Sequence, residues 1–468
     1  MRALLSRMLL LLGVIALIAA IPLLTGYSEL RQARTSEAEG KVFQADAHYE
    51  RAAHLLPWRP GSWEKVGIAR FHTEDLPAAI TFLEREQDRG TLSDQGWYLL
   101  GLSYWKSGDH AAAIAAWGGR LEESASFTRY YEYIAGYFRE YGDVQVERSA
   151  LERWIEAEGS DDAWGHYRLG QLLSISQPDR ALREFLQAAS LDPQYDPAVE
   201  SMRTALNLAL LETDDSRRLV IVGRGLGILQ DWTLAAEAFR QAISLDRSNA
   251  EAWAWLGEAE GQLGLDGRAE LDTAVSLEPG NPIVHSLRGL YWMRRDQPEQ
   301  ALQDYQRAAG LEPHNPAWRI SIAEAHSLNG DLQAALQSYL DAIEIAPSQA
   351  IYWRLLADFC ARYDMQVEEY GLPAAQAAIE LSPEDPLVLD SLGWILVKLE
   401  RYDEAQDALE HALSLDPELA LPYLHLGLLA LHMDDWETAR EDFRQAQELD
   451  PDGPVGEQAK RLLDQYFP

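Results

Sequence analysis

The sequence has little cysteine and, for its length, little positive charge. Its one cysteine, Cys360, excludes an intrachain disulfide and any metal or iron–sulfur site built from several cysteines. Among 468 residues, 40 lysines and arginines stand against 75 acidic residues, which gives a formal net charge of −35. That charge repels the phosphates of nucleic acids and anionic lipid surfaces. We therefore expect no nucleic-acid partner, and we expect protein partners, for which basic segments would be the most compatible.

Catalytic and metal-binding motifs are also missing, since the sequence contains no P-loop, no G-x-S-x-G and no H-E-x-x-H. His425 and His432 could share a helix face, and His48 and His54 less well, but no third ligand accompanies either pair, so structural or surface roles are favoured. Cys360 stands at a helix-packing position, which predicts a buried, inert thiol. We expect no enzyme activity, no catalytic residue, no metal and no cofactor. Acidic pairs are better explained by helix capping and solvation than by acid–base chemistry; they lie at 161–162, 214–215, 368–369 and 434–435.

One long hydrophobic run stands near the start of the chain. Residues 8–24 carry no charge, and Arg2 and Arg7 precede them. This run is at the short end for a membrane span and slightly long for the core of a signal peptide. No A-x-A cleavage site follows, although a small residue such as Gly26 could permit cleavage. An uncleaved transmembrane anchor over residues 1–25 is favoured, and a cleaved signal is the alternative.

The orientation of this anchor rests on a nearly balanced charge count. Arg2 and Arg7 precede the run, and Arg31, Arg34 and Lys41 follow it. The short, signal-like tail favours a cytoplasmic N-terminus and a body on the other side of the membrane. The opposite orientation, with the body in the cytoplasm, stays open. The style of the anchor favours a bacterial source.

A motif ending in proline recurs through the chain with a period of about 34. From Pro279 onward, these prolines step by 34, 34, 36, 34 and 34 residues. An alanine precedes each by five positions, a bulky residue stands three before that alanine, and small residues stand four and sixteen before the bulky one. Such periodicity predicts an array of helix pairs. The alanines are Ala188, Ala274, Ala308, Ala342, Ala378, Ala412 and Ala446.

The fullest copy is "GWYLLGLSYWKSGDHAAAIAAW", residues 96–117, which resembles the tetratricopeptide repeat (TPR). This resemblance implies an all-α fold, an α-solenoid forming a right-handed superhelix of antiparallel helix pairs, here preceded by one transmembrane helix. It covers most of the chain after the anchor, from about Gly26 to Pro451, in eleven or twelve repeats. Close helix crossing is expected where small residues meet, the glycine of the first helix against the first alanine of the second. The residues that match W-x2-LG-x2-Y-x8-A-x3-F are Trp97, Leu100, Gly101, Tyr104, Ala113 and Trp117.

Irregularities in the period set the expected domain boundaries. The repeat around Trp253 is two residues short, and the one around Trp353 carries two extra residues. A surplus of about 20 residues predicts an irregular extra helix without a partner at 196–215. We therefore expect one repeat block at 26–195, a second at 216–453, and a capping helix at 454–468, which solenoids need to cover their last apolar face.

The stretch "LVIVGRGLGIL", residues 219–229, imitates a dinucleotide-binding loop. Its glycines do not fit G-x-G-x-x-G, because Ile228 stands where the third glycine belongs. Gly223 lies twelve residues before Ala235, as the repeat requires. The stretch is therefore predicted to be the first helix of a repeat. Gly225 and Gly227 weaken a helix by about 1 kcal/mol each relative to alanine, and are interpreted as a hinge.

The resemblance also implies a binding face, since in TPR proteins the first helices line the concave surface that holds partner segments. The predicted function is a membrane-tethered scaffold for protein–protein interaction in an envelope assembly, secretion or biogenesis complex. The alternative is a regulatory or substrate-presenting subunit of a membrane-associated enzyme complex, with the array in the cytoplasm. A lysine/asparagine clamp for a C-terminal carboxylate is not found. The candidate face comprises Tyr98, Leu102, Trp105, Arg354, Asp358, Asp390, Trp394, Leu424, Leu428 and His432.

Overall fold

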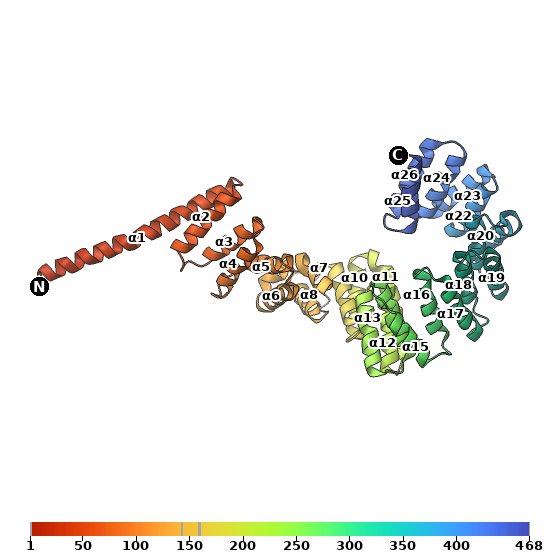
Figure 1. Ribbon diagram of the computed structural model, residues 1–468, viewed down its shortest axis with the longest axis horizontal. Coiled ribbons are helices and arrows are strands. Elements are labelled where there is room, and N and C mark those ends of the chain that lie inside the picture. Colours follow the sequence, from red (N-terminus) through yellow and green to blue (C-terminus); the bar gives the residue numbers. More distant parts are fainter. Residues whose placement is uncertain (1, 142–143, 158–160, 468) are drawn as a thin grey trace. The chain divides into compact units, whose positions relative to one another are not determined.

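A computed structural model describes the backbone of residues 2–141, 144–157 and 161–467. The side chains of residues 2–19, 122, 125, 128, 132, 140, 141 and 157 lie outside this description. Twenty-six α-helices follow one another, and the described residues contain no strand. The chain is an all-α solenoid of antiparallel helix pairs, in which neighbours along the sequence lie side by side (Figure 1). Two compact units divide it. One comprises Met1–Asp214 with Ile221–Ala238, and the other comprises Asp215–Val220 with Phe239–Pro468.

The first unit contains eleven complete helices and parts of two that are shared with the second unit. The complete ones are α1 (Arg2–Ala38), α2 (Val42–Leu55), α3 (Ser62–His72), α4 (Leu76–Gln87), α5 (Asp94–Lys106), α6 (His110–Glu123), α7 (Tyr131–Tyr141), α8 (Val144–Ala157), α9 (Ala163–Leu173), α10 (Pro178–Leu191) and α11 (Asp196–Leu211). The shared ones are α12 (Asp215–Ile228) and α13 (Trp232–Leu245).

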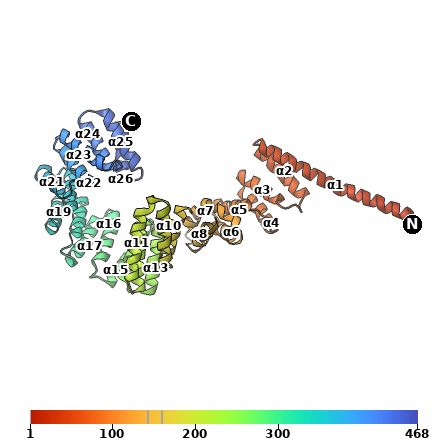
Figure 2. The same cartoon turned by 180° about the vertical axis from the view of Figure 1, so that it is seen from behind.

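The second unit continues with regular pairs and ends on a single helix. Figures 1 and 2 both show α26 beside α25, where Ala459 is buried against the last pair. Its helices are α14 (Ala250–Gln262), α15 (Arg268–Leu277), α16 (Pro282–Arg294), α17 (Pro298–Leu311), α18 (Pro316–Leu328), α19 (Leu332–Ile345), α20 (Ala350–Tyr363), α21 (Leu372–Leu381), α22 (Pro386–Lys398), α23 (Tyr402–Leu415), α24 (Ala420–His432), α25 (Trp436–Leu449) and α26 (Pro454–Tyr466).

The helices begin where a short polar side chain caps the first turn. The Asn281 and Asn315 side chains accept hydrogen bonds from the backbone N–H groups of Ile283 and Ala317. These N–H groups have no partner within the helix, so the caps satisfy them. Two of the acidic pairs have this role. Asp162 caps α9 and Asp435 caps α25. The capping interpretation is therefore confirmed for these two pairs, because Asp162 and Asp435 each accept a hydrogen bond from a backbone N–H group.

Within a pair, the helices meet where glycine faces a bulky side chain. A Cβ on Gly393 would lie 2.6 Å from Cγ of Leu409, and one on Gly427 would lie 2.6 Å from the Phe443 ring. The expected approach to the first alanine of the second helix is present at Gly393, where the Cβ would lie 3.3 Å from the Ala405 carbonyl oxygen, but the nearest neighbour is the bulky residue four positions after that alanine. The other such pairs are Gly67 with Leu83, Gly101 with Trp117, Gly170 with Phe185, and Gly289 with Tyr305.

The two irregular repeats keep the pairing in different ways. In the short repeat, α15 has only 10 residues, and a Cβ on Gly267 would lie 2.0 Å from the Gly257 carbonyl oxygen, so backbone meets backbone. In the long repeat, a π-helical turn, Val367–Gly371, absorbs the extra residues before α21. Asp364 and Gln366 adopt left-handed backbone conformations on either side of the connection.

The glycine-rich stretch is helical, as predicted, and forms most of α12. Its glycines have a packing reason. A Cβ on Gly225 would lie 2.7 Å from that of Ala205 and 3.0 Å from the Met202 sulfur, and a Cβ on Gly227 would lie 2.8 Å from the Trp232 ring. This contact gives α11 a partner in α12, so the expectation of an unpaired helix is wrong. Close packing accounts for these two glycines, and the hinge stays a prediction.

The N-terminal anchor stays a prediction. Among the described residues, none of the helices combines the length and the apolar character that crossing a membrane requires. Most of the expected span at residues 1–25 falls on residues 1–19, whose side chains lie outside the description.

Candidate protein-binding face

A fixed tryptophan stands on the first helix of one repeat in the second unit. The Trp394 ring on α22 stacks on His425 of α24, with the ring centroids 4.6 Å apart and the planes 3° from parallel. His425 Nδ1 lies 2.8 Å from Oδ1 of the buried Asp390, which holds the imidazole in place. The Lys398 ammonium lies 4.9 Å from the Trp394 ring, within cation–π range. We call these four residues, Asp390, Trp394, Lys398 and His425, the Trp394 platform.

Next to the platform, Asp358 of α20 is a partly buried carboxylate. Arg354 Nη1 donates to it at 2.8 Å, and the Ser391 hydroxyl donates to its other oxygen at 2.5 Å. Burial raises the pKa of Asp358 above its ordinary value of 3.8, although Ser391 and Arg354 act in the opposite direction. The contacts join α20 to α22 on the side that carries Trp394.

The structure divides the predicted binding residues by exposure. Leu102, Asp390 and Leu424 are buried, so they offer a partner no area and support their neighbours instead. Leu428 is half-buried against the core of the last repeat. His432 is exposed, and its ring centroid lies 6.0 Å from that of Tyr402.

The first unit carries a cluster of aromatic residues on α5, α6, the 3₁₀ turn Ala125–Tyr130 and α7, which we call the α5–α7 aromatic cluster. Tyr98 stacks on Tyr130, with ring centroids 5.0 Å apart, and lies 6.2 Å from the exposed Tyr133. Trp105 stacks on His110 at 4.1 Å and lies 4.8 Å from Tyr137. Tyr98 and Trp105, the two half-buried predicted residues of this repeat, are thus both joined to side chains of the next helices.

Sequence reasoning missed the partners that fix these residues. Lys398 lies four positions after Trp394, a spacing that places both on one helix face, and could have been found. Tyr130, Tyr133 and Tyr137 are spaced by three and four residues in "RYYEYIAGY", which also places them on one side. The contact of Asp390 with His425 could not have been found, because it joins different repeats 35 residues apart.

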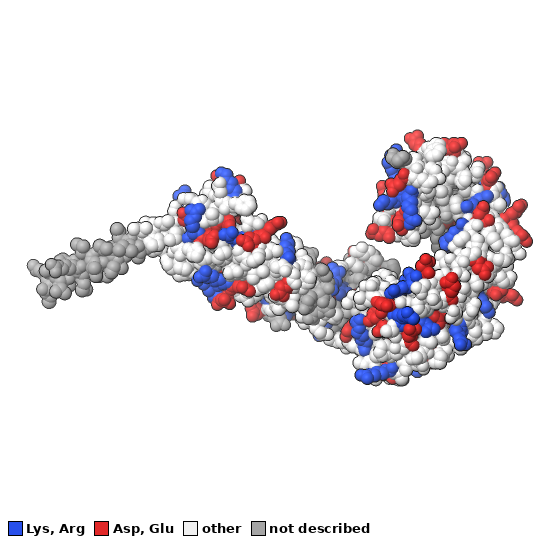
Figure 3. All heavy atoms as spheres, viewed as in Figure 1, with Lys and Arg blue, Asp and Glu red and all other residues white. Residues whose placement is uncertain are grey.

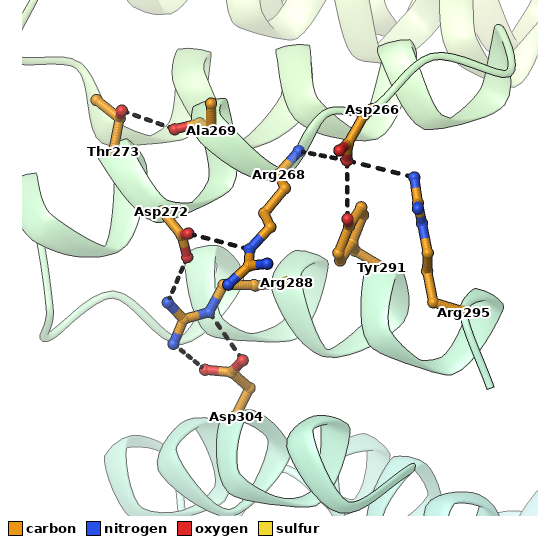
Figure 4. A network of polar contacts seen from close by, with 9 residues as sticks. All are labelled: Asp266, Arg268, Ala269, Asp272, Thr273, Arg288, Tyr291, Arg295 and Asp304. Carbon is orange, nitrogen blue, oxygen red and sulfur yellow. Dashed lines mark hydrogen bonds and ion pairs between the residues drawn. The ribbon is translucent and has the colours of Figure 1, made fainter. Parts of the chain in front are cut away.

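Ion pairs between the α15, α16 and α17 helices form the polar network of Figure 4. Arg288 reaches both oxygens of Asp304 at 2.9 and 2.8 Å, and Asp272 at 3.1 Å. Burial opposes ionisation of Asp304, but hydrogen bonds from His285 and Arg288 keep its pKa below the ordinary 3.8. Arg288 thus joins α16 to Asp272 of α15 and Asp304 of α17, while Arg268 pairs with Asp272 of its own helix at 3.5 Å, so the network is structural support.

Neither a metal site nor a reactive thiol emerges from the described part of the chain. No three histidine, cysteine or acidic side chains there are placed to hold a metal ion. Cys360 of α20 is fully buried in the core, and burial raises the pKa of its thiol to about 12, so it is protonated and inert. Figure 3 shows acidic and basic side chains interspersed over the visible face, without a large area of one sign.

Family models decide the class of the protein. Models described as tetratricopeptide repeats match residues 94–116, 228–282, 293–359 and 391–454. The chain is a tetratricopeptide repeat protein. It is a scaffold for protein–protein interaction, from a family that is typically non-enzymatic and that binds protein and peptide partners.

Several solved structures are similar to this TPR protein at low identity. The yeast Tom70 crystal structure is 16% identical with a TM-score of 0.43, covering 94% of this chain and 95% of Tom70. MamA from Desulfovibrio magneticus RS-1 is 24% identical with a TM-score of 0.31, covering 37% of this chain and 97% of MamA. PilF from Pseudomonas aeruginosa is 17% identical with a TM-score of 0.35, covering 46% and 98%. No curated protein matches the sequence.

Proposed function

We propose that this TPR protein is a membrane-tethered scaffold that binds a protein partner through the first-helix face around the Trp394 platform. The observation that carries the proposal is the fixed position of Trp394. A half-buried tryptophan stacks on a histidine, and a buried carboxylate holds that histidine. Tryptophan is enriched among the residues that dominate binding energy at interfaces.

A fixed anchor favours binding because less conformational freedom is lost when the partner arrives. Ordering one flexible side chain at an interface costs about 0.5–1.5 kcal/mol. In this platform the contacts with His425 and Lys398 already order the Trp394 side chain before a partner binds. A partner then gains the apolar area of the indole without ordering it.

The charges beside the platform select the chemistry of the partner. Asp358 lies within reach of Arg354 and Ser391 and keeps part of its surface exposed. A segment with an apolar side chain for Trp394 and a basic side chain near Asp358 fits this arrangement, and it also suits a chain of net charge −35.

Tethering raises the effective concentration of partners at the membrane. Residues 1–25 would supply the tether, and a bacterial envelope assembly, secretion or biogenesis complex would supply the partner. The test is a pair of reporters fused after the last residue, one active only outside the cytoplasm and one active only inside. Activity of the first reporter is expected. Activity of the second alone would place the array in the cytoplasm and favour a regulatory subunit of an enzyme complex.

Partner recovery tests the binding face. The full chain would be purified from its own membranes after crosslinking, as wild type and as Trp394→Ala. We expect the partner recovered with wild type to fall at least tenfold with Trp394→Ala, because its anchor is removed. Trp436→Ala is the matched control, since this exposed tryptophan begins the second helix α25. Equal recovery with Trp394→Ala and wild type would remove the platform from the binding face.

A further inference from the structure

Three arginines line a hollow on α1, directly after the expected anchor. The hollow has a volume of about 550 Å³, and Arg31 and Arg34 of α1 line it together with Arg59 from the turn after α2. Tyr27 lies at its edge. Residues 27, 31 and 34 are spaced as i, i+4 and i+7, so they share one face of the helix.

Close packing holds the turn after α2 beside the part of α1 around Gly26. A Cβ on Gly26 would lie 2.6 Å from Cγ of Leu56, so the end of α2 lies directly against α1 there. The Arg59 guanidinium consequently lies 5.6 Å from the centre of the Tyr27 ring. Segments about 30 residues apart in sequence thus build one site.

The three arginines are a local exception in an acidic chain. Within the described residues, no ion pair joins any of them to a carboxylate. The nearby acidic residues of α1 have other partners. Glu29 pairs with His48 at 2.6 Å and Arg51 at 3.4 Å, and Glu37 accepts a hydrogen bond from Tyr49.

Measured along α1, the hollow begins within the headgroup layer of a bilayer and extends beyond it. With a helical rise of 1.5 Å per residue, Tyr27 stands about 4.5 Å, Arg31 about 10 Å and Arg34 about 15 Å beyond Leu24, the end of the uncharged run. The headgroup layer is about 5–8 Å thick on each side of the hydrocarbon core. Helical side chains tilt toward the N-terminus, which here is the direction of the expected span, and arginine extends further in the same way.

Exposed aromatic residues surround the arginines. Tyr27 is 54% exposed and Trp58, next to Arg59, is 63% exposed. Tyrosine and tryptophan are the residues enriched at membrane–water interfaces. Leu24, 72% exposed, extends the same helix face toward the apolar run.

We propose that Arg31, Arg34 and Arg59 form a binding site for the phosphate of an anionic phospholipid headgroup. The inference rests on the proposed membrane tether. Guanidinium groups bind phosphate oxygens through paired charge-assisted hydrogen bonds, and Tyr27 and Trp58 fill the interface around them. The site would hold the first helix pair against the bilayer, although the chain as a whole carries the opposite charge.

Lipid selectivity of the full chain tests this site. The chain would be reconstituted in phosphatidylcholine vesicles, and the association of spin-labelled phosphatidylglycerol would be compared with that of spin-labelled phosphatidylcholine. We expect wild type to prefer phosphatidylglycerol, and each arginine-to-glutamine change at 31, 34 and 59 to reduce the preference by up to about fivefold. Millimolar inorganic phosphate should leave the preference unchanged, whereas its loss would assign the site to free phosphate and overturn the lipid proposal.

Matched variants separate charge, folding and tethering. Arg440→Gln/Arg444→Gln/Arg461→Gln changes the net charge equally at the other end of the chain and should keep the preference. Arg31→Lys/Arg34→Lys/Arg59→Lys should keep most of it. Equal preference in wild type and the triple glutamine variant, with both retained in the vesicles after alkaline extraction, would overturn the lipid site alone. Failure of wild type to remain in the vesicles would contradict the tether itself.

Discussion

The α5–α7 aromatic cluster and the Trp394 platform occupy the same repeat frame but use it differently. Tyr98 and Asp390 both stand three residues before the close-packing glycine, and Leu102 and Trp394 both follow it. In the first repeat, Tyr98 stacks outward on Tyr130 and the following leucine is buried. In the second, the aspartate is buried and the following tryptophan is half-buried over His425. The backbone frame sets the positions, and the next repeat decides which side chain is presented.

The largest expected effect tests whether the two units use the same packing of a bulky residue on the repeat glycine. Trp117 and Phe443 are fully buried against the glycines of their repeats. Trp117→Ala and Phe443→Ala should each lower the free energy of unfolding of their own unit by about 3–5 kcal/mol, because a large cavity replaces the ring. Hydrogen exchange, which reports each helix separately, measures both. A large loss of unfolding free energy in one unit and none in the other would show that the two units do not share this packing.

A smaller loss is expected when the glycines gain a methyl group. A Cβ on Gly101 would lie 2.1 Å from Nε1 of Trp117, and one on Gly393 would lie 2.6 Å from Cγ of Leu409. Alanine at either position should cost about 1–3 kcal/mol through overpacking. The cost should be greater at Gly101, since a rigid indole yields less than leucine. Gly119→Ala, whose Cβ meets nothing within 4 Å, is the control and should stabilise α6 in urea denaturation.

The equivalent positions 98 and 390 should respond differently to loss of their polar groups. Asp390→Ala leaves the buried His425 ring without its partner and should cost about 1–3 kcal/mol. Tyr98→Phe keeps the stacking on Tyr130 and should change stability by less than about 0.5 kcal/mol. Asp390→Asn, which can still accept a hydrogen bond, should be milder than alanine. Similar losses for Tyr98→Phe and Asp390→Ala in thermal unfolding would show that the two positions are not used differently.

The smallest effect is a difference in pH dependence. Burial raises the pKa of Asp358 above 3.8, and burial together with neighbouring tyrosines raises the pKa of Tyr98 above 10.0. Each folded group holds its proton more tightly than the unfolded chain does, so its stability contribution is complete below the ordinary pKa and is lost as the pH rises through the folded value. For Asp358 that loss begins above about pH 4, and for Tyr98 only above about pH 10.

Unfolding curves across pH for wild type, Asp358→Asn and Tyr98→Phe measure these contributions. The asparagine variant should lose the Asp358 part of the acidic-range slope, because burial also raises the pKa of Glu324 and Asp442. The phenylalanine variant should lose only the Tyr98 part of the alkaline slope. An unchanged acidic-range slope in Asp358→Asn would assign that slope to another group.

The sequence was sufficient to predict the helix pairs, because small and bulky residues recur at fixed spacing and proline marks each ending. It also identified α12 as a repeat helix in spite of its glycines. It failed where contacts join different helices. The packing of Gly225 on Met202 and Ala205 depends on how α11 turns back, which no local pattern encodes.

The candidate face was predictable as a set of positions but not as a surface. Periodicity correctly placed Trp394 and Asp358 on first helices. Their exposure depends on partners in neighbouring repeats, such as His425 and Ser391, and so does the burial of Asp390. A sequence period of 34 locates the helix face, whereas cross-repeat hydrogen bonds decide which residues remain accessible.

Photo-crosslinking from single positions tests the central claim most directly. A photoreactive residue would replace Lys398, beside Trp394, or Gln406, exposed on the second helix α23, in the full chain in its own membranes. We expect a discrete protein adduct from position 398 that disappears in the Trp394→Ala background, and no such adduct from position 406. The same adduct from both positions, or an adduct at 398 that survives Trp394→Ala, would contradict that claim.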